Sequence, residues 1–152
     1  MTLTKPLTEY SFVLLVVFIL SSFNIKSPIK TYTISIKITN IRNNKGFIQL
    51  QLYRSQKTFE LETPYKTIRI SKQNVTDKTL LYQIKGIAPS NYGIALLDDE
   101  NGNKKMDYGW LYPKEGFGFS NYYHTGWSKP TFSNFKFCLN QNEFVNMKIR
   151  YM

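Results

Sequence analysis

The sequence has too few cysteines and histidines for several common kinds of site. One Cys leaves no partner for an intramolecular disulfide and excludes a cysteine-rich zinc site. One His excludes a metal centre built from several histidines. Acidic residues are also scarce, ten against twenty Lys and Arg, so the formal net charge is +10 at pH 7. These shortages remove most hydrolase signatures and leave a basic protein without a disulfide framework.

The N-terminal apolar run is too short for a typical membrane span. Residues 12–20 are nine consecutive apolar residues, whereas a helix that crosses a bilayer needs about 20. Lys5 precedes this run and Ser21-Ser22 follows it, which is the layout of a secretory signal peptide. We therefore predict a signal peptide over residues 1–24 and a secreted or periplasmic protein. An uncleaved membrane anchor is the alternative.

The rest of the chain has enough apolar surface for one packed domain. Of the 152 residues, 42% are hydrophobic and 16% aromatic, and we find no repeat or linker that marks a second domain. The sequence thus predicts a single domain over residues 31–152, expected to be monomeric. The basic residues are spread along the chain, with no run longer than Lys104-Lys105, so we expect a solvated surface and no nucleic-acid partner. Anionic envelope polymers or lipid surfaces are the alternative partners for this charge.

Apolar residues alternate with polar ones at the period of β-strands. Tyr32, Ile34, Ile36 and Ile38 begin this pattern, which indicates one buried and one solvated face. The pattern recurs in seven segments, residues 31–41, 47–53, 66–71, 79–85, 92–98, 134–139 and 144–151. We predict an all-β fold, a seven-stranded antiparallel β-sandwich of immunoglobulin-like or transthyretin-like type. The first two strands are expected to form a hairpin, and residues 55–61 a helical turn.

A long aromatic-rich loop separates the fifth and sixth predicted strands. The alternation stops for about 35 residues, and unstructured connections of that length are usually functional or disordered. Nine of the chain's 24 aromatic residues lie between positions 108 and 132, which argues for an ordered segment. Its candidate ligand platform is Trp110, Tyr112, Tyr122, Tyr123 and Trp127. Exposed rings would suit a sugar or peptide, but their apolar area favours burial as a second small core.

The same loop begins with a cluster of Asp and Asn residues. Asp99, Asn101, Asn103 and Asp107 occupy positions 1, 3, 5 and 9 of an EF-hand-like spacing, with the Lys105 carbonyl at position 7. These oxygen ligands suit Ca²⁺ better than a transition metal. Lys104 occupies the position that favours Gly, and Trp110 stands where a bidentate Glu would complete the ligand shell. The alternative is a turn in which Asp and Asn side chains accept hydrogen bonds from their own backbone.

Three ordered motifs resemble a known bacterial family. They are a Pro89-containing turn with Tyr92 leading into a strand, the Asp99-x-Asn101-x-Asn103 loop, and the segment Lys114-Glu115-Gly116-Phe117-Gly118-Phe119-Ser120-Asn121. This combination is similar to the family catalogued as domain of unknown function 2141, from about residue 33 to the C-terminus. The resemblance implies export and a β-sandwich, and it brings no established activity. Family loops usually carry Gly where Lys104 stands, a departure that bears on metal binding.

No set of residues predicts an enzyme. His124 has no motif-placed Ser or Cys partner and is expected to be a hydrogen-bonded loop residue, and Cys138 a packed thiol in a strand. Asp98, Asp99 and Asp107 would have to flank a glycosidic bond from one loop, which is rarely possible. We therefore predict a non-enzymatic binding or envelope-associated module, with an envelope glycan or protein as partner. A carbohydrate-active enzyme and a purely structural domain are the alternatives.

Overall fold

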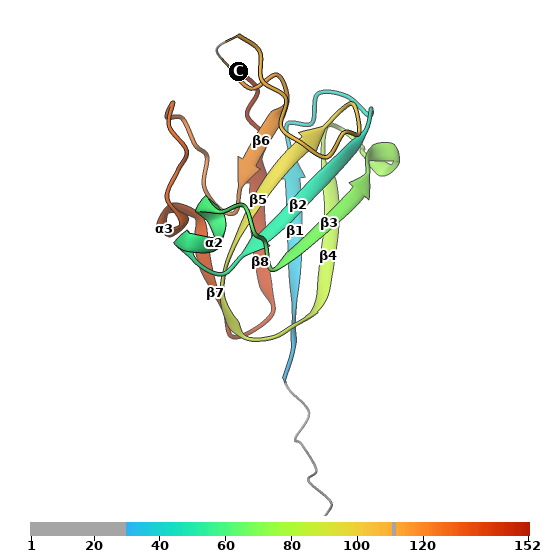
Figure 1. The fold of residues 1–152 in the computed structure, drawn as a ribbon. Coiled ribbons are helices and arrows are strands. Elements are labelled where there is room, and N and C mark those ends of the chain that lie inside the picture. Colours follow the sequence, from blue (N-terminus) through green and yellow to red (C-terminus); the bar gives the residue numbers. More distant parts are fainter. Residues whose placement is uncertain (1–29, 111) are drawn as a thin grey trace, which may run out of the picture.

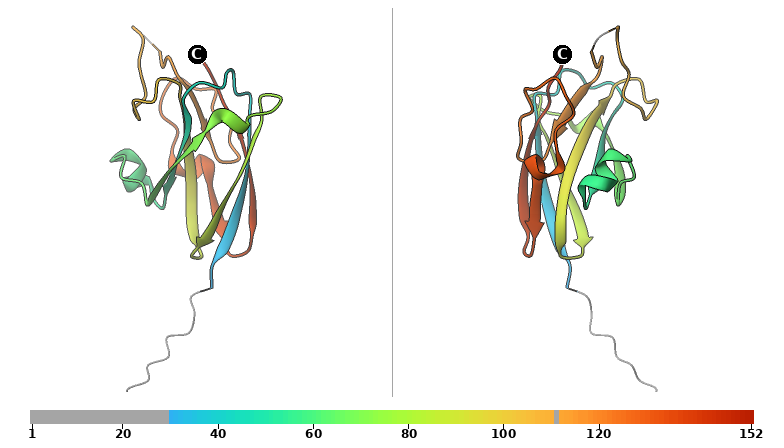
Figure 2. Two further views of the ribbon diagram at one scale, coloured as in Figure 1. Left: turned by 90° about the vertical axis from the view of Figure 1, so that its right-hand side faces the viewer. Right: turned by 60° about the vertical axis from the view of Figure 1, so that its left-hand side comes forward.

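The computed structural model describes residues 30–110 and 112–152, and the signal peptide predicted over residues 1–24 lies outside them. Eight strands form two sheets that face each other (Figures 1 and 2). The strands are β1 (Tyr32–Thr39), β2 (Phe47–Tyr53), β3 (Lys66–Ser71), β4 (Leu80–Ile87), β5 (Ser90–Asp99), β6 (Gly116–Phe119), β7 (Lys136–Leu139) and β8 (Glu143–Lys148). Two short helices, α2 (Gln56–Glu60) and α3 (Phe132–Phe135), and a 3-10 turn, η1 (Lys72–Asn74), complete the described elements. Among them we find no helix with the length and apolar character that a membrane crossing requires.

The two sheets differ in size and in strand direction. The three-stranded sheet has the order β4-β1-β8, in which β1 is antiparallel to β4 and parallel to β8. The five-stranded sheet is antiparallel and has the order β3-β2-β5-β6, with β7 also paired to β5. Strand β7 pairs with the first part of β5 and β6 with its last part, so the two short strands follow one another along one edge of β5.

The prediction of an all-β fold is confirmed, but three details of the predicted antiparallel sandwich are wrong. Strand β1 runs parallel to β8, so the smaller sheet is mixed instead of antiparallel. The described residues form eight strands instead of seven, because Gly116–Phe119 forms β6 within the long aromatic segment. The first two strands do not form a hairpin, since β1 lies between β4 and β8 while β2 lies between β3 and β5. Alternation predicts which side chains are buried but not which strand pairs with which, and this explains the errors in pairing. Strand β6 has no strand signal in the sequence because two of its four residues are Gly, which is depleted in strands.

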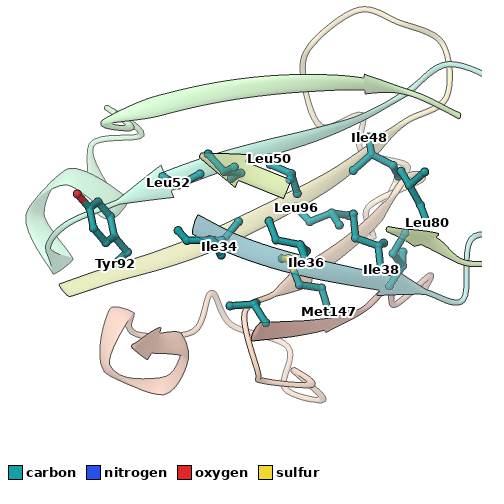
Figure 3. Packing of buried hydrophobic residues seen from close by; sticks show 14 of the residues in the cluster. Ile34, Ile36, Ile38, Ile48, Leu50, Leu52, Leu80, Tyr92, Leu96 and Met147 are labelled. Carbon is teal, nitrogen blue, oxygen red and sulfur yellow. The ribbon is translucent and has the colours of Figure 1, made fainter. Parts of the chain in front are cut away.

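The main core fills the space between the sheets. Ile34, Ile36 and Ile38 of β1 face Leu50 and Leu52 of β2 across this space, and all five are essentially buried (Figure 3). Burying one such side chain contributes roughly 1.5–3 kcal/mol to folding. The strict alternation of β1 and β2 therefore has a direct structural cause, because each strand gives one face to this core.

A second, aromatic cluster lies on the outer face of the five-stranded sheet. It consists of Tyr53, Phe59, Phe119, Phe132 and Phe135. Helices α2 and α3 bring Phe59 and Phe135 onto this face from the same side of the sheet (Figure 1). Gly93 permits this packing, because a Cβ atom there would lie 2.5 Å from the Phe135 ring. The cluster covers one end of the outer face and ends where an open groove begins.

Candidate functional site

An open groove of about 610 Å³ lies on the outer face of the five-stranded sheet. Gln49 and Gln51 of β2 form part of its floor, because their neighbours Ile48, Leu50 and Leu52 point into the core on the opposite face. The loop that follows β5 forms one wall through residues 104–108. The segment 126–130, between β6 and α3, contributes another part of the lining. The long aromatic segment is therefore ordered around a groove.

Exposed aromatic rings line this groove. Trp127 is 78% exposed and Tyr112 41% exposed, and their ring centroids are 5.2 Å apart. Tyr108 is also exposed and lines the same groove. The expected burial of the candidate platform rings as a second core is wrong for four of the five, which are all exposed: Trp110, Tyr112, Tyr123 and Trp127. Phenylalanines of the same stretch, Phe119 and Phe132, take the buried positions.

The structure does not bring all five candidate platform rings together. Trp110 is 96% exposed and is not part of the groove lining. Tyr122 and Tyr123 lie beside a second, smaller hollow of about 420 Å³, where Lys148 Nζ is 5.0 Å from the centroid of the Tyr123 ring. Only Tyr112 and Trp127 of the predicted platform share the main groove.

The groove carries more positive than negative charge. Lys104 and Lys105 line it and are exposed, and neither forms a salt bridge within the described residues. Lys129 also lines it and is paired with Glu62 at 3.0 Å. An anionic ligand would therefore meet two lysines that have no competing carboxylate.

His124 lines the groove but is held by its own loop. Its Nε2 atom lies 2.7 Å from the carbonyl oxygen of Ser128, and because a carbonyl can only accept, Nε2 carries the proton of this hydrogen bond. The prediction of a hydrogen-bonded loop histidine is confirmed. Cys138, expected to be a packed thiol, is instead exposed on β7.

Three of the four predicted metal ligands are brought together. Asp107 accepts hydrogen bonds from the side-chain amides of Asn101 and Asn103, the latter at 3.0 Å to Oδ1. The Asn101 side chain also accepts a bond from the Asn103 backbone, and the Asn103 side chain accepts one from Lys105 N. These backbone contacts are the Asx-turn pattern that the sequence offered as the alternative. The turn and a metal site share the same oxygen atoms, so the two interpretations are compatible.

Asp99, the fourth predicted ligand, is buried at the base of the loop. Its Oδ2 atom accepts bonds from Arg69 at 2.8 Å and from the Lys104 backbone N–H at 3.1 Å. Its Oδ1 atom is buried and has no hydrogen-bond partner among the described residues. Lys104 adopts φ +69°, a left-handed conformation that favours Gly. The lysine thus stands at the position where the spacing calls for Gly.

Glu115 ties the two ends of the loop together, a role that the sequence did not reveal. Its carboxylate is buried and accepts bonds from the backbone N–H groups of Glu100 at 3.0 Å and Asp107 at 3.3 Å. Burial raises the pKa of Glu115, and the carboxylates of Asp107 and Asp99 raise it further. Glu115 is therefore a positioning residue for the loop.

A second buried carboxylate, Asp98, lies on the core side of β5. Lys72 Nζ contacts its Oδ1 atom at 2.5 Å, and the Tyr151 hydroxyl donates to Oδ2 at 2.6 Å. Lys72 and Asp98 are both fully buried. Burial raises the pKa of Asp98, against the opposing effect of Lys72 and Tyr151. The sequence held a signal for Asp98 but not for Lys72, because alternation from Tyr92 through Leu96 places Asp98 on the buried face.

The comparison with protein families shows to which family this chain belongs. Residues 36–146 match the model of domain of unknown function 2141, described as an uncharacterized protein conserved in bacteria. The chain belongs to this family. The resemblance predicted from the sequence is thus confirmed, and the matched part of this DUF2141 chain includes the Asp/Asn loop, Glu115 and the groove-lining rings. Neither the curated proteins nor the solved structures yielded a match.

The loop of this DUF2141 domain is also held by a partly exposed ion pair. Arg42 donates to Glu100 through Nε at 2.6 Å and through an Nη atom at 2.8 Å. These hydrogen bonds are the main cause that lowers the pKa of Glu100 below its ordinary value of 4.5. A carboxyl group whose pKa is lowered on folding stabilises the folded state at pH values above its ordinary pKa. This stability is lost as the pH falls through the folded-state pKa.

We expect Glu100→Gln to weaken this pH dependence. Urea denaturation of the wild type should show a loss of about 0.5–1 kcal/mol from Glu100 as the pH falls from about 6 to about 3. The variant should lack that contribution. Glu60→Gln is the matched control, since Glu60 is exposed on α2 and hydrogen-bonded to Gln56. Parallel pH profiles of the wild type and Glu100→Gln would contradict the assignment.

Proposed function

We propose that this protein is an exported, non-enzymatic module that binds an acidic envelope glycan in the groove on its outer sheet face. The observation that supports this most is the exposed ring pair Tyr112 and Trp127 at 5.2 Å beside the groove. Large exposed aromatic groups gathered at a hollow are typical of binding surfaces. Export is inferred from the signal-peptide layout of residues 1–24.

The chemistry of the groove favours a sugar chain over a purely apolar ligand. Aromatic rings offer flat apolar faces, against which the C–H faces of pyranose rings can pack. Gln51 is half-buried in the groove floor and supplies an amide N–H group that can donate to a hydroxyl, whereas Gln49 is buried and its Nε2 atom donates to the Lys104 carbonyl. Lys104 and Lys105 add positive charge, which selects carboxylated or phosphorylated sugars over neutral ones. An open groove also accommodates a polymer that continues beyond the site.

Buried acids argue for binding instead of glycoside hydrolysis. A glycosidase needs two carboxyl groups that flank a bond about 5–10 Å apart. Asp98 and Asp99 are fully buried and ion-paired with Lys72 and Arg69, which keeps them away from a substrate. Asp107 is the remaining acid of the predicted set and is hydrogen-bonded to two asparagine amides. We therefore assign the loop acids to holding the loop.

Binding can be measured by calorimetric titration with an acidic and a neutral polysaccharide of matched chain length at about 150 mM salt, where long-range charge effects are largely screened. We expect the acidic polymer to bind. Trp127→Ala and Tyr112→Ala should each weaken its affinity about tenfold, which corresponds to about 1.4 kcal/mol per ring.

Trp110→Ala is the matched control, because Trp110 is the most exposed ring and does not line the groove. It should bind as the wild type does. Equal losses in Trp110→Ala and Trp127→Ala would contradict the groove as the site. A blank result with every acidic glycan would favour a purely structural domain, and turnover of the polymer would favour an enzyme.

A further inference from the structure

We propose that the Asp99–Asp107 loop binds Ca²⁺ and that the ion fixes the loop as one wall of the groove. Asp99 supplies the decisive atom. Its Oδ2 is held by Arg69 and by the Lys104 backbone N–H, while Oδ1 is buried without a hydrogen-bond partner in the described part of the chain. An unpaired buried carboxylate oxygen carries a large desolvation cost, which a bound cation would remove.

The donor atoms of the loop fit a hard cation. Asp99 and Asp107 offer carboxylate oxygens, Asn101 and Asn103 amide oxygens, and Lys105 a backbone carbonyl, at positions 1, 9, 3, 5 and 7. Within residues 30–110 and 112–152, no three His, Cys, Asp or Glu side chains are grouped to hold a metal. A set of two carboxylates completed by neutral oxygens therefore points away from transition metals and toward Ca²⁺.

Asp107 is already turned toward the same side chains that would share the ion. It lies within hydrogen-bonding distance of the amide groups of Asn101 and Asn103. In the absence of a cation, amide N–H groups are the natural partners of this carboxylate. A cation entering the loop would replace them as partners of Asp107. The Oδ1 atoms of Asn101 and Asn103 accept backbone N–H groups and each keeps a second lone pair for the ion.

Bound Ca²⁺ would affect the groove through the backbone of the loop, because the loop forms part of the groove lining. Lys104, Lys105, Met106 and Tyr108 line the groove and lie within the loop or directly after it. Glu115 holds the backbone at both Glu100 and Asp107, and Asp99 Oδ2 holds it at Lys104, so an ion bound to the loop carboxylates would act on the backbone that forms the wall. Fixing residues 104–108 should strengthen ligand binding by removing the entropy cost of ordering that wall, a coupling that rests on the proposed function.

Three cationic groups in or beside the loop predict that its affinity for Ca²⁺ is weak. Arg69 partly neutralises Asp99, and Lys104 and Lys105 add charge within the loop. Loops of extracellular modules bind Ca²⁺ with Kd of about 10⁻⁴–10⁻³ M, and we expect a value in this range. Lys104→Gly should bind Ca²⁺ several-fold more tightly, because it removes one charge and places Gly at the left-handed position.

The test is calorimetric titration of the chelator-treated full chain with CaCl₂, together with the melting temperature. The wild type should release or absorb heat and melt higher at about 10 mM Ca²⁺. Asp107→Asn should lose at least about tenfold in affinity, since site affinity depends on ligand charge. Asp77→Asn is the matched control, because Asp77 is an exposed acid in the turn before β4 and is not one of the loop donors. It should leave Ca²⁺ binding unchanged.

Two results would overturn the proposal. The first is the absence of both heat and melting shift in the wild type and in Lys104→Gly. The second is binding that Asp77→Asn weakens as much as Asp107→Asn, which would mean diffuse attraction. Amide hydrogen exchange of residues 104–108 tests the wall without any glycan, because Ca²⁺ should slow it. Unchanged exchange despite bound Ca²⁺ would leave a metal site but disprove the fixed wall, and a failure of glycan binding alone would count only against the proposed function.

Discussion

Replacing Lys72 by Met is expected to lower the free energy of unfolding by about 3–5 kcal/mol at pH 7. Lys72 is fully buried, and its ammonium group is the cation that pairs with the equally buried Asp98. Methionine fills most of the space of the lysine stem but leaves a carboxylate without its counter-ion. Tyr151 retains one hydrogen bond to this carboxylate, which is not enough to replace the lost charge. Urea denaturation measures the loss.

The pH and a second substitution distinguish this cause from a simple packing defect. Burial already raises the pKa of Asp98, and removing Lys72 should raise it further. A raised folded-state pKa gives stability at low pH that is lost as the pH rises, so Lys72→Met should lose less at about pH 4 than at pH 7. The double variant Lys72→Met with Asp98→Leu should recover much of the loss. Equal instability of the single and double variants at both pH values would contradict a charge effect.

The buried pair also shows what alternation in a sequence can and cannot predict. The pattern from Tyr92 to Leu96 continues to Asp98 and therefore assigns this acid to the core face. It does not identify the partner, because Lys72 follows β3 and reaches Asp98 across β2. A contact between residues so far apart in the sequence depends on which strands are neighbours in the sheet, and alternation does not encode this. The same limit explains the hairpin predicted for β1 and β2, whose alternation suits two facing sheets as well as one.

Local features of the site could be predicted more fully than distant ones. The Asp/Asn spacing correctly placed Asn101, Asn103 and Asp107 near one another, because these contacts span only a few residues. Arg69 and Glu115, which hold the same loop, come from β3 and from just before β6 and carry no local signal. The immunoglobulin-like or transthyretin-like type and the metal stay predictions.

The aromatic segment shows the corresponding limit for burial. Its high ring content predicts an ordered segment, and within it the phenylalanines differ in burial from the tyrosines and tryptophans. Phe119 and Phe132 are buried in the aromatic cluster, Phe132 as the first residue of α3, whereas Trp127 and Tyr112 are exposed and line the groove. Phenylalanine has no polar atom to satisfy, so it is the ring that is buried at least cost. Residue type within the segment, more than ring density, separates core from surface here.

Phe59→Ala is expected to destabilise the protein by about 3–5 kcal/mol, the second large effect. Phe59 is the buried residue of α2, and its ring makes edge contacts with Tyr53 at 5.2 Å and Phe135 at 4.9 Å between centroids. Alanine would leave a cavity between β2 and the two helices. Leu61→Ala, two residues further on, is the matched control, because Leu61 is 62% exposed and should cost less than about 0.5 kcal/mol.

The unfolding and hydrogen exchange of Phe59→Ala would show whether the aromatic cluster stabilises the groove. Phe59 lies in both the cluster and the groove lining, so its loss should loosen α2 and the groove floor together. Urea denaturation should give a lower midpoint with an unchanged slope if the whole domain unfolds in one step. Hydrogen exchange should quicken in α2 and α3 more than in β1, whose core lies on the other face of the five-stranded sheet. A loss as small as that of Leu61→Ala would mean that the main core alone holds the fold and that the cluster serves only to shape the groove.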